Sequence, residues 1–115
     1  MVFEDYLLRE GFNLDSLRGF EVSLAGNKRG VETVMNHLHL FDIQHVGCAD
    51  LSADKVVLLG ETLTSIYKAK LAYQYPNRPC QVNFHQPEDI ENLEEFEISF
   101  WQVKHESDDS RWTTL

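Results

Sequence analysis

Residues 52–75 read SADKVVLLGETLTSIYKAKLAYQY and decide the fold, because apolar side chains recur through this stretch at helical spacing. Ser52 is a suitable N-cap, Asp54 suits the first turn, and Pro76 ends the helix. At about 1.5 Å per residue the helix approaches 35 Å, so we expect it to be the spine of the domain. The expected apolar stripe consists of Val56, Leu59, Leu63, Ile66, Tyr67, Lys70 and Tyr73. Gly60 costs this helix about 1 kcal/mol relative to alanine, which indicates close packing or a slight bend.

Two alternating segments follow the long helix. Apolar Cys80, Val82 and Phe84 alternate with polar neighbours, which predicts a strand with one buried face. A second alternation runs through residues 96–101. The two strands are expected to form a hairpin with a long connection over residues 86–95.

The segments before the long helix give shorter patterns. Residues 3–10 have helical spacing and precede Gly11, so they predict a short helix. Residues 20–24 alternate apolar and polar side chains, which predicts a half-buried strand before a turn at Gly26 and Asn27. A further helix is expected to begin near Gly30, with a stripe made of Val31, Val34, Met35 and Leu38.

This order of elements is typical of the α+β class. We expect a small two-layer domain, with an antiparallel sheet of three or four strands packed against the long central helix and one or two shorter helices. Residues 1–106 are expected to form a single domain, and residues 107–115 a flexible C-terminal tail. The inner face of the sheet is expected to consist of Phe20, Val22, Leu24, Val82, Phe84, Phe96, Ile98 and Phe100.

Composition and charge exclude several classes of protein. The chain has 115 residues and a formal net charge of −9, which repels nucleic-acid backbones and anionic lipid surfaces. Its longest apolar run is too short to span a bilayer, and its N-terminus carries acids where a secretory signal carries bases. We therefore expect a cytoplasmic protein that binds neither nucleic acid nor membrane. Cys48 and Cys80 are expected to be reduced thiols.

The negative charge is concentrated near the C-terminal end. Residues 81–109 hold nine acids and one base, Lys104. The acids around the expected hairpin connection include Glu88, Glu91, Glu94, Glu95 and Glu97. Such a negative rim would attract a protein with a basic surface, although acidic loops also simply keep domains dispersed. Trp101 falls on the outer face of the last strand, either as a scattered surface residue or as part of a contact patch.

The stretch around residues 37–45 is the most suggestive of chemistry. His37, His39, Asp42 and His45 are residue types that bind zinc. On a strand, His37 and His39 would share one face, whereas on a helix residues two apart point away from each other. The stripe ending at Leu38 favours the helix, which predicts that the two imidazoles are separated and that these histidines bond backbone carbonyls near a helix end.

The sequence has none of the recognisable hydrolase, dithiol or nucleotide-binding motifs, so an enzyme is disfavoured and no cofactor is expected. Our first hypothesis is a non-catalytic protein-binding or regulatory module, immunity-like or inhibitor-like by analogy, which uses the acidic hairpin and Trp101 against a basic partner. The alternative is a zinc-binding protein or metal-dependent hydrolase that uses the histidine stretch. A third possibility is a homodimer joined through an exposed apolar face or a sheet edge.

Overall fold

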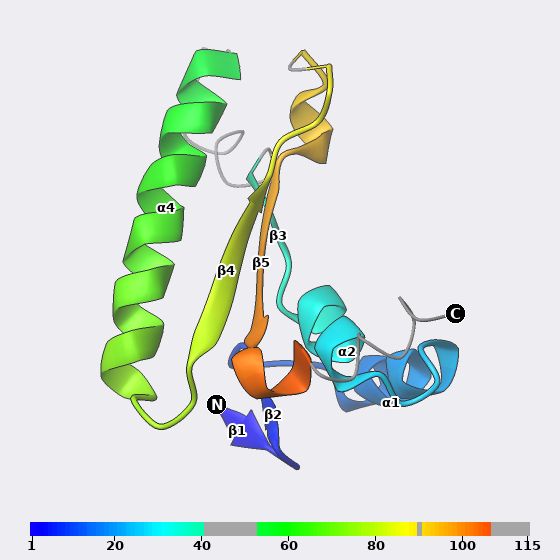
Figure 1. Cartoon of the computed structure of the whole chain (residues 1–115). Coiled ribbons are helices and arrows are strands. Elements are labelled where there is room, and N and C mark those ends of the chain that lie inside the picture. The colour runs from blue at the N-terminus through cyan, green and yellow to red at the C-terminus, as the bar shows by residue number, and fades with distance from the viewer. Residues whose placement is uncertain (41–52, 90, 107–115) are drawn as a thin grey trace.

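The computed structural model describes residues 1–40, 53–89 and 91–106 and confirms the α+β class (Figure 1). The tail at 107–115 lies outside these residues. The elements in chain order are β1 (Val2–Phe3), β2 (Tyr6–Leu7), α1 (Leu14–Ser23), α2 (Lys28–Met35), β3 (Leu38–His39), α4 (Ala53–Gln74), β4 (Cys80–His85), the 3-10 turn η1 (Leu93–Glu95), β5 (Glu97–Gln102) and the 3-10 turn η2 (Val103–His105).

The main sheet has three antiparallel strands in the order β3-β5-β4. The predicted hairpin is confirmed, since β4 and β5 pair along their whole length, with Val82 opposite Phe100 and Phe84 opposite Ile98. Strand β3 is short and pairs only with the first two residues of β5. A separate two-stranded sheet, formed by β1 and β2, lies at the opposite end of β5 from the hairpin connection (Figure 1).

Helix α4 confirms the predicted long helix, but its buried face is rotated from the expected stripe. The side chains that pack against the sheet include Val56, Leu63, Tyr67 and Leu71, which follow one another at helical spacing. Two members of the expected stripe, Ile66 and Tyr73, are instead 53% and 88% exposed. The buried face is rotated because it includes Gly60, which an apolar stripe read from side chains does not contain.

The absence of a side chain at Gly60 lets α4 approach β4 closely. A Cβ atom at this position would lie 2.1 Å from Cζ of Phe84, so only glycine fits beneath the ring as it stands. The close packing expected from a glycine inside the helix is therefore confirmed. Phe84 also packs near Phe96, with ring centroids 6.2 Å apart.

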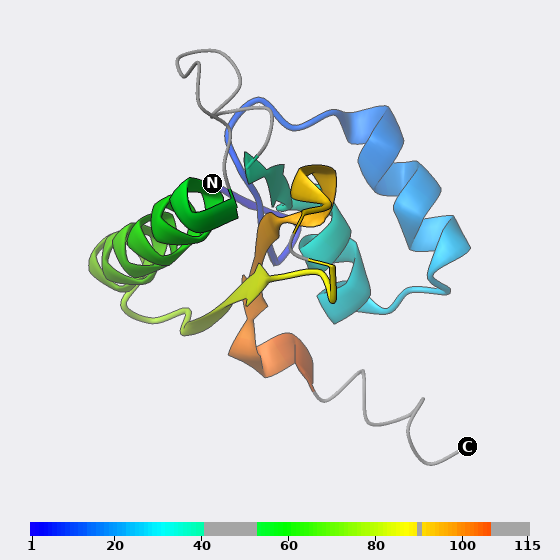
Figure 2. The ribbon, with the colours of Figure 1, turned by 90° about the horizontal axis from the view of Figure 1, so that it is seen from above.

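Strand β5 is buried on both of its faces. Ile98 and Phe100 face α4, where they belong to the apolar clusters that contain α4 side chains. On the other face, the guanidinium of Arg29 in α2 lies 4.5 Å from the ring centroid of Trp101. Figure 2 shows α4 and α2 on opposite sides of the sheet. Helix α2 thus adds a cover on the second face, beyond the two layers that the sequence predicts.

The predicted helix over residues 3–10 is wrong. These residues form the β1–β2 hairpin, which turns at Glu4 and Asp5 with positive φ angles of 49° and 71°. The three residues from Tyr6 to Leu8 are all buried because they are enclosed from several directions: Tyr6 and Leu8 pack with the α1 and α2 cluster, and Leu7 with α4. Consecutive buried residues fit the spacing of a helix as well as that of an enclosed strand.

The predicted strand over residues 20–24 is also wrong, because residues 14–23 form helix α1. The side chain of Asn13 caps this helix by accepting a hydrogen bond from the backbone N of Ser16, at 2.9 Å. Phe20 and Leu24 pack with buried Leu17, while Val22 is 83% exposed. Phe20, Val22 and Leu24 therefore do not belong to the inner face of the sheet, whereas the five expected members from β4 and the β5 region lie in its apolar clusters.

The helix expected near Gly30 is confirmed as α2, but it ends at Met35, so Leu38 lies in β3 opposite Ile98. In the described part of the chain, no helix combines the length and the apolar character needed to cross a membrane.

Candidate functional site

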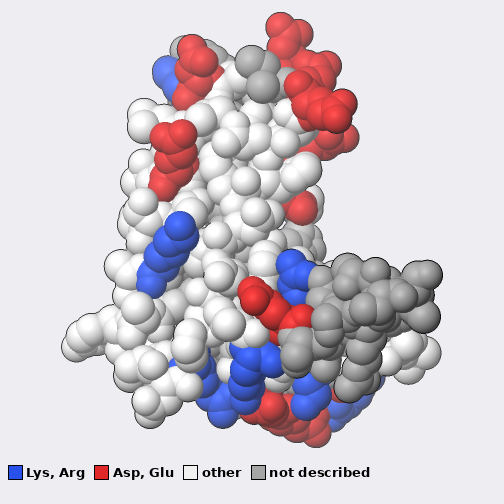
Figure 3. Space-filling view, in the orientation of Figure 1, with Lys and Arg blue, Asp and Glu red and all other residues white. Residues whose placement is uncertain are grey.

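The acids of the hairpin connection gather at one end of the molecule. We define the acidic tip as Glu88, Asp89, Glu91, Glu94 and Glu95, all of which are exposed. Figure 3 shows this group at the upper right of the molecule, at the end of the β4–β5 hairpin. Among the described residues, none of these five carboxylates forms an ion pair. The tip therefore presents uncompensated negative charge to solvent.

The backbone of the acidic tip is anchored to the core. The carboxylate of Asp89 accepts a hydrogen bond from the backbone N of Glu91, and the Asp89 carbonyl accepts one from Asn92, both at 3.0 Å. Leu93 then packs against the apolar cluster that contains Phe96. Among the described residues between these acids, the side chain of Leu93 therefore holds the connection against the sheet.

Glu97 and Trp101, which the sequence grouped with these acids, lie apart from the acidic tip. Glu97 begins β5 and stands opposite His39, whose Nδ1 is 3.8 Å from a Glu97 carboxylate oxygen. Trp101 is near the other end of β5, only 9% exposed, and donates its indole N–H to Glu106 at 3.0 Å. Because Arg29 also covers its ring, Trp101 is a packed residue in this structure, not a scattered surface residue.

The expected separation of His37 and His39 is wrong. Helix α2 ends before them, and β3 brings the rings together, with centroids 4.9 Å apart and planes at 86°. Nδ1 of His37 is 2.5 Å from the carbonyl oxygen of Val34 and donates a hydrogen bond to it. Asp42 and His45 lie outside the described residues. Among the residues that the structure does describe, no group of three or more His, Cys, Asp or Glu side chains is arranged to hold a metal ion.

A buried polar cluster escaped the sequence analysis. Glu32 of α2 is fully buried, and its carboxylate accepts hydrogen bonds from the backbone N of Leu7 at 2.8 Å and from the backbone and side chain of Gln102. Asn36, one turn later, donates to the carbonyl of Leu7 at 2.8 Å. The available signal in the sequence was that Glu32 and Asn36 are four residues apart, which places them on one side of α2 next to its apolar stripe. Its bonds tie the end of α2 to β5 and to the hairpin of β1 and β2 with the residues that follow it, so the cluster is structural.

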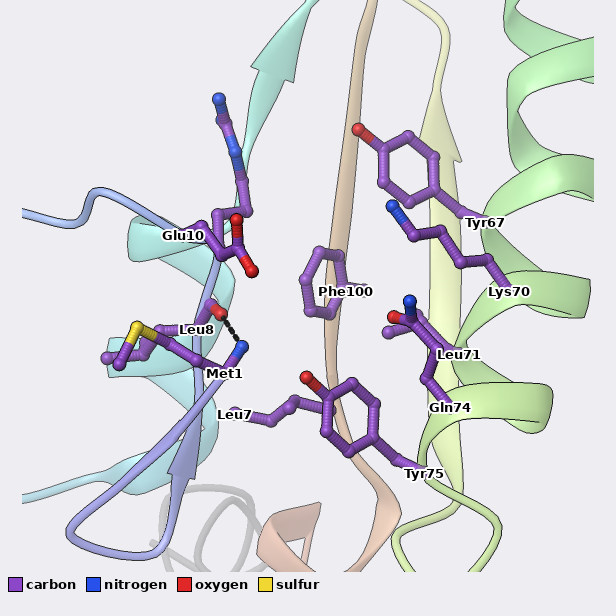
Figure 4. A pocket seen from close by; sticks show the side chains of 11 residues that line it. Met1, Leu7, Leu8, Glu10, Tyr67, Lys70, Leu71, Gln74, Tyr75 and Phe100 are labelled. Carbon is purple, nitrogen blue, oxygen red and sulfur yellow. Dashed lines mark hydrogen bonds between the residues drawn. The ribbon is translucent and has the colours of Figure 1, made fainter.

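A cavity of about 280 Å³ opens between the segment after β2 and α4 (Figure 4). Leu7, Leu71 and Phe100 form its apolar wall, and Figure 4 shows the amine of Lys70 and the carboxylate of Glu10 pointing into it from opposite sides. The sequence could not reveal it, because the lining residues before Gly11 and those of α4 are more than fifty positions apart in the chain. Its lining contains no serine, cysteine or histidine, and its ionisable side chains are Arg9, Glu10, Tyr67, Lys70 and Tyr75.

Comparisons of this chain with protein-family models, with curated proteins and with solved structures found no match.

Proposed function

We propose that this chain is a non-catalytic protein-binding module, and that its acidic tip engages a basic surface on a partner protein. The observation that carries the proposal is the concentration of five exposed carboxylates on one anchored connection, without ion pairs among the described residues. Closely spaced carboxylates on a held backbone repel one another, and a partner that brings lysine or arginine side chains relieves this repulsion.

The anchoring by Leu93 supports recognition over a purely solubilising role. Charges that only keep a domain dispersed need no defined position, whereas those that bind a partner gain affinity when their positions are set beforehand. The sheet and the packed side chain of Leu93 hold the backbone of the tip at the end of the hairpin. A flat or concave basic surface could therefore meet several of these carboxylates at once.

The test uses a lysine-rich peptide and an aspartate-rich peptide of equal length as probes of the wild-type chain and two variants. The tip variant carries Glu91→Gln and Glu94→Gln, and the control variant carries Glu10→Gln and Asp15→Asn, so both lose two exposed acids. We expect the wild-type chain to bind the lysine-rich peptide and not the aspartate-rich one. The affinity for the lysine-rich peptide should fall about tenfold in the tip variant and much less in the control variant. Equal losses in both variants, or no binding, would overturn the proposal.

A second candidate function is the binding of a divalent metal, such as zinc, at His37 and His39. It is favoured by the contact between the two rings and by the backbone hydrogen bond of His37 Nδ1, the outer bond that metal-ligating histidines usually make. Titration with zinc chloride, followed by calorimetry, tests it. Binding should be lost in His39→Gln and kept in His85→Gln, which removes an exposed histidine from β4. Retention of binding in His39→Gln would exclude this site.

A further inference from the structure

Strand β4 has an open outer edge. It is the last strand of the β3-β5-β4 sheet, and no described residue pairs with its far side. The backbone N of Val103 donates to the carbonyl of Pro79 at 2.8 Å, which makes these two a hydrogen-bonded pair. Because such pairs alternate along an antiparallel ladder, the backbone groups of Cys80, Val82 and Phe84 point away from β5, toward the open edge.

This edge lacks the usual devices that prevent pairing. Exposed edges are commonly protected by lysine, by proline within the strand or by a bulge. The polar side chains of β4 are Gln81, Asn83 and His85, so the strand carries no lysine and no acid, and its register with β5 is unbroken. Helix α4 covers one face of the strand through Val82 and Phe84, which leaves the edge accessible to another strand.

A groove runs between this edge and α4. A cavity of about 310 Å³ there is lined by Leu71, Ala72 and Tyr75 on the helix side and by Cys80 and Val82 on the strand side. A strand added to β4 would direct alternate side chains toward this groove. The incoming strand must therefore present half-buried apolar residues at every second position, as β4 itself does.

The charges on this face define the direction of the added strand. Glu61 and Lys68 are seven residues apart on α4 and so lie on the same side of the helix, two turns from each other. Gly60 lies against Phe84, and Leu71 packs with Cys80, so the middle of β4 is level with the helix between Glu61 and Lys68. Figure 3 shows acidic and basic side chains spaced along this side of the molecule.

We propose that β4 pairs antiparallel with β4 of a second copy of this chain across a two-fold axis, which joins two three-stranded sheets into one of six strands. A two-fold axis reverses the second copy, so Glu61 of each chain faces Lys68 of the other, and Val82 and Phe84 of each strand lie beside the apolar residues of its partner. The inference goes beyond the proposed function, because it uses the strand edge and does not depend on what the acidic tip binds.

The first test is the mass in solution, measured by sedimentation equilibrium over a wide range of concentration. We expect the wild-type chain to reach twice its 13.3 kDa. Asn83→Lys should halve that mass, because two lysines would meet near the two-fold axis. Val22→Lys adds the same charge on α1, at an 83% exposed site, and should stay dimeric. A monomeric wild type, or a dimeric Asn83→Lys variant whose folding is confirmed by circular dichroism, would overturn the proposal.

Hydrogen exchange adds a test that is specific to the edge. In the wild type, the amides of Val82 and Phe84 should exchange more slowly as concentration rises, and this protection should be lost in Asn83→Lys. The amides of Asn83 and His85, which bond β5, serve as internal controls and should stay protected in both chains. Lys68→Glu should weaken the dimer and Glu61→Lys in the same chain should restore it. Concentration-independent exchange at Val82 and Phe84 would place the contact elsewhere and refute this pairing.

Discussion

Glu32 and Gln102 are joined twice in the interior: one carboxylate oxygen accepts from the Gln102 backbone N at 2.7 Å, and the other accepts from its side-chain amide at 2.6 Å. Strand β3 pairs only with residues 97 and 98 of β5. Beyond residue 98, the backbone N–H and C=O groups of β5 that point toward the β3 side therefore have no strand to bond. The side chains of Glu32 in α2 and of Asn36, the C-cap residue of α2, take the place of that strand. Glu32 serves the N–H of Gln102, and Asn36 donates to the carbonyl of Phe100 at 3.4 Å.

Replacing Glu32 with leucine should therefore be severely destabilising. The substitution leaves the backbone N–H groups of Leu7 and Gln102 buried without an acceptor, and we expect a loss of about 3 kcal/mol in the free energy of unfolding. Urea denaturation measures this loss. Glu10→Gln, which changes an exposed acid, is the control and should stay near the wild-type value. An equal stability of Glu32→Leu and wild type would show that these hydrogen bonds contribute no net stability.

Gly60→Ala should also destabilise the protein, although alanine has a higher helix propensity than glycine. The propensity gain is about 1 kcal/mol, but the added methyl group must displace the ring of Phe84, and overpacking of this kind costs more. We expect a net loss of about 2 kcal/mol in thermal or urea unfolding. Gly19→Ala in α1 is a matched control, because nothing lies within 4 Å of its added Cβ, and it should stabilise the chain slightly.

A double-mutant cycle locates the cause of this effect. If the clash with the ring is responsible, Gly60→Ala combined with Phe84→Leu should lose less stability than the sum of the two single changes. Strict additivity would instead indicate that alanine perturbs the helix itself.

The parts of the fold that could be predicted from the sequence are those whose contacts are repetitive. Helix α4 and strand β4 bury apolar residues at a regular interval on one face, so the period of each segment indicates its structure. The alternating apolar residues of β5 give the same signal, although β5 is buried on both faces. Residues 3–10 fail this condition, because Tyr6, Leu7 and Leu8 are enclosed by different elements. Residues 20–24 show only a short alternation of apolar and polar side chains, and so short a pattern does not distinguish a strand from the end of a helix. The cap at Asn13 and the burial of Leu17 favour the helix α1 instead.

The candidate site divides in the same way. The acidic tip could be placed from sequence because its residues are neighbours in the chain, and the hairpin that carries them was predicted correctly. The contact of His37 with His39 depended on where α2 ends, and element ends are the least certain part of a periodicity argument. The cavity beside Phe100 and the cluster around Glu32 unite distant segments, for which a single sequence holds no direct signal.

Asp5 should contribute to acid sensitivity. Hydrogen bonds from Lys104 and then Arg78 lower the pKa of its carboxyl from 3.8 to about 2. Because the folded pKa is below the unfolded one, these bonds stabilise the native state above about pH 4, and the contribution is lost as the pH falls toward 2. Asparagine is tolerated at the positive φ angle of residue 5, so Asp5→Asn keeps the turn but removes the titrating carboxyl. The melting temperature of this variant should therefore fall less than that of wild type over this pH range. Asp15→Asn is the control. If the melting temperature of Asp5→Asn fell with pH in parallel with that of wild type, Asp5 would not be a source of the acid sensitivity.

Cys80 should react slowly with thiol reagents, in spite of its place at the sheet edge. Burial raises the pKa of its thiol from 9.0 to about 11, and the negative charge of Glu32 adds to this, while the thiol hydrogen is donated to the carbonyl of Arg78 at 3.3 Å. A rise of this size lowers the thiolate population near neutral pH about a hundredfold. In a Cys48→Ser chain, where Cys80 is the one remaining thiol, alkylation by iodoacetamide should therefore be about a hundredfold slower in buffer than in urea. Similar rates in the two solvents would mean that the thiol ionises as freely in the folded chain as in the unfolded one.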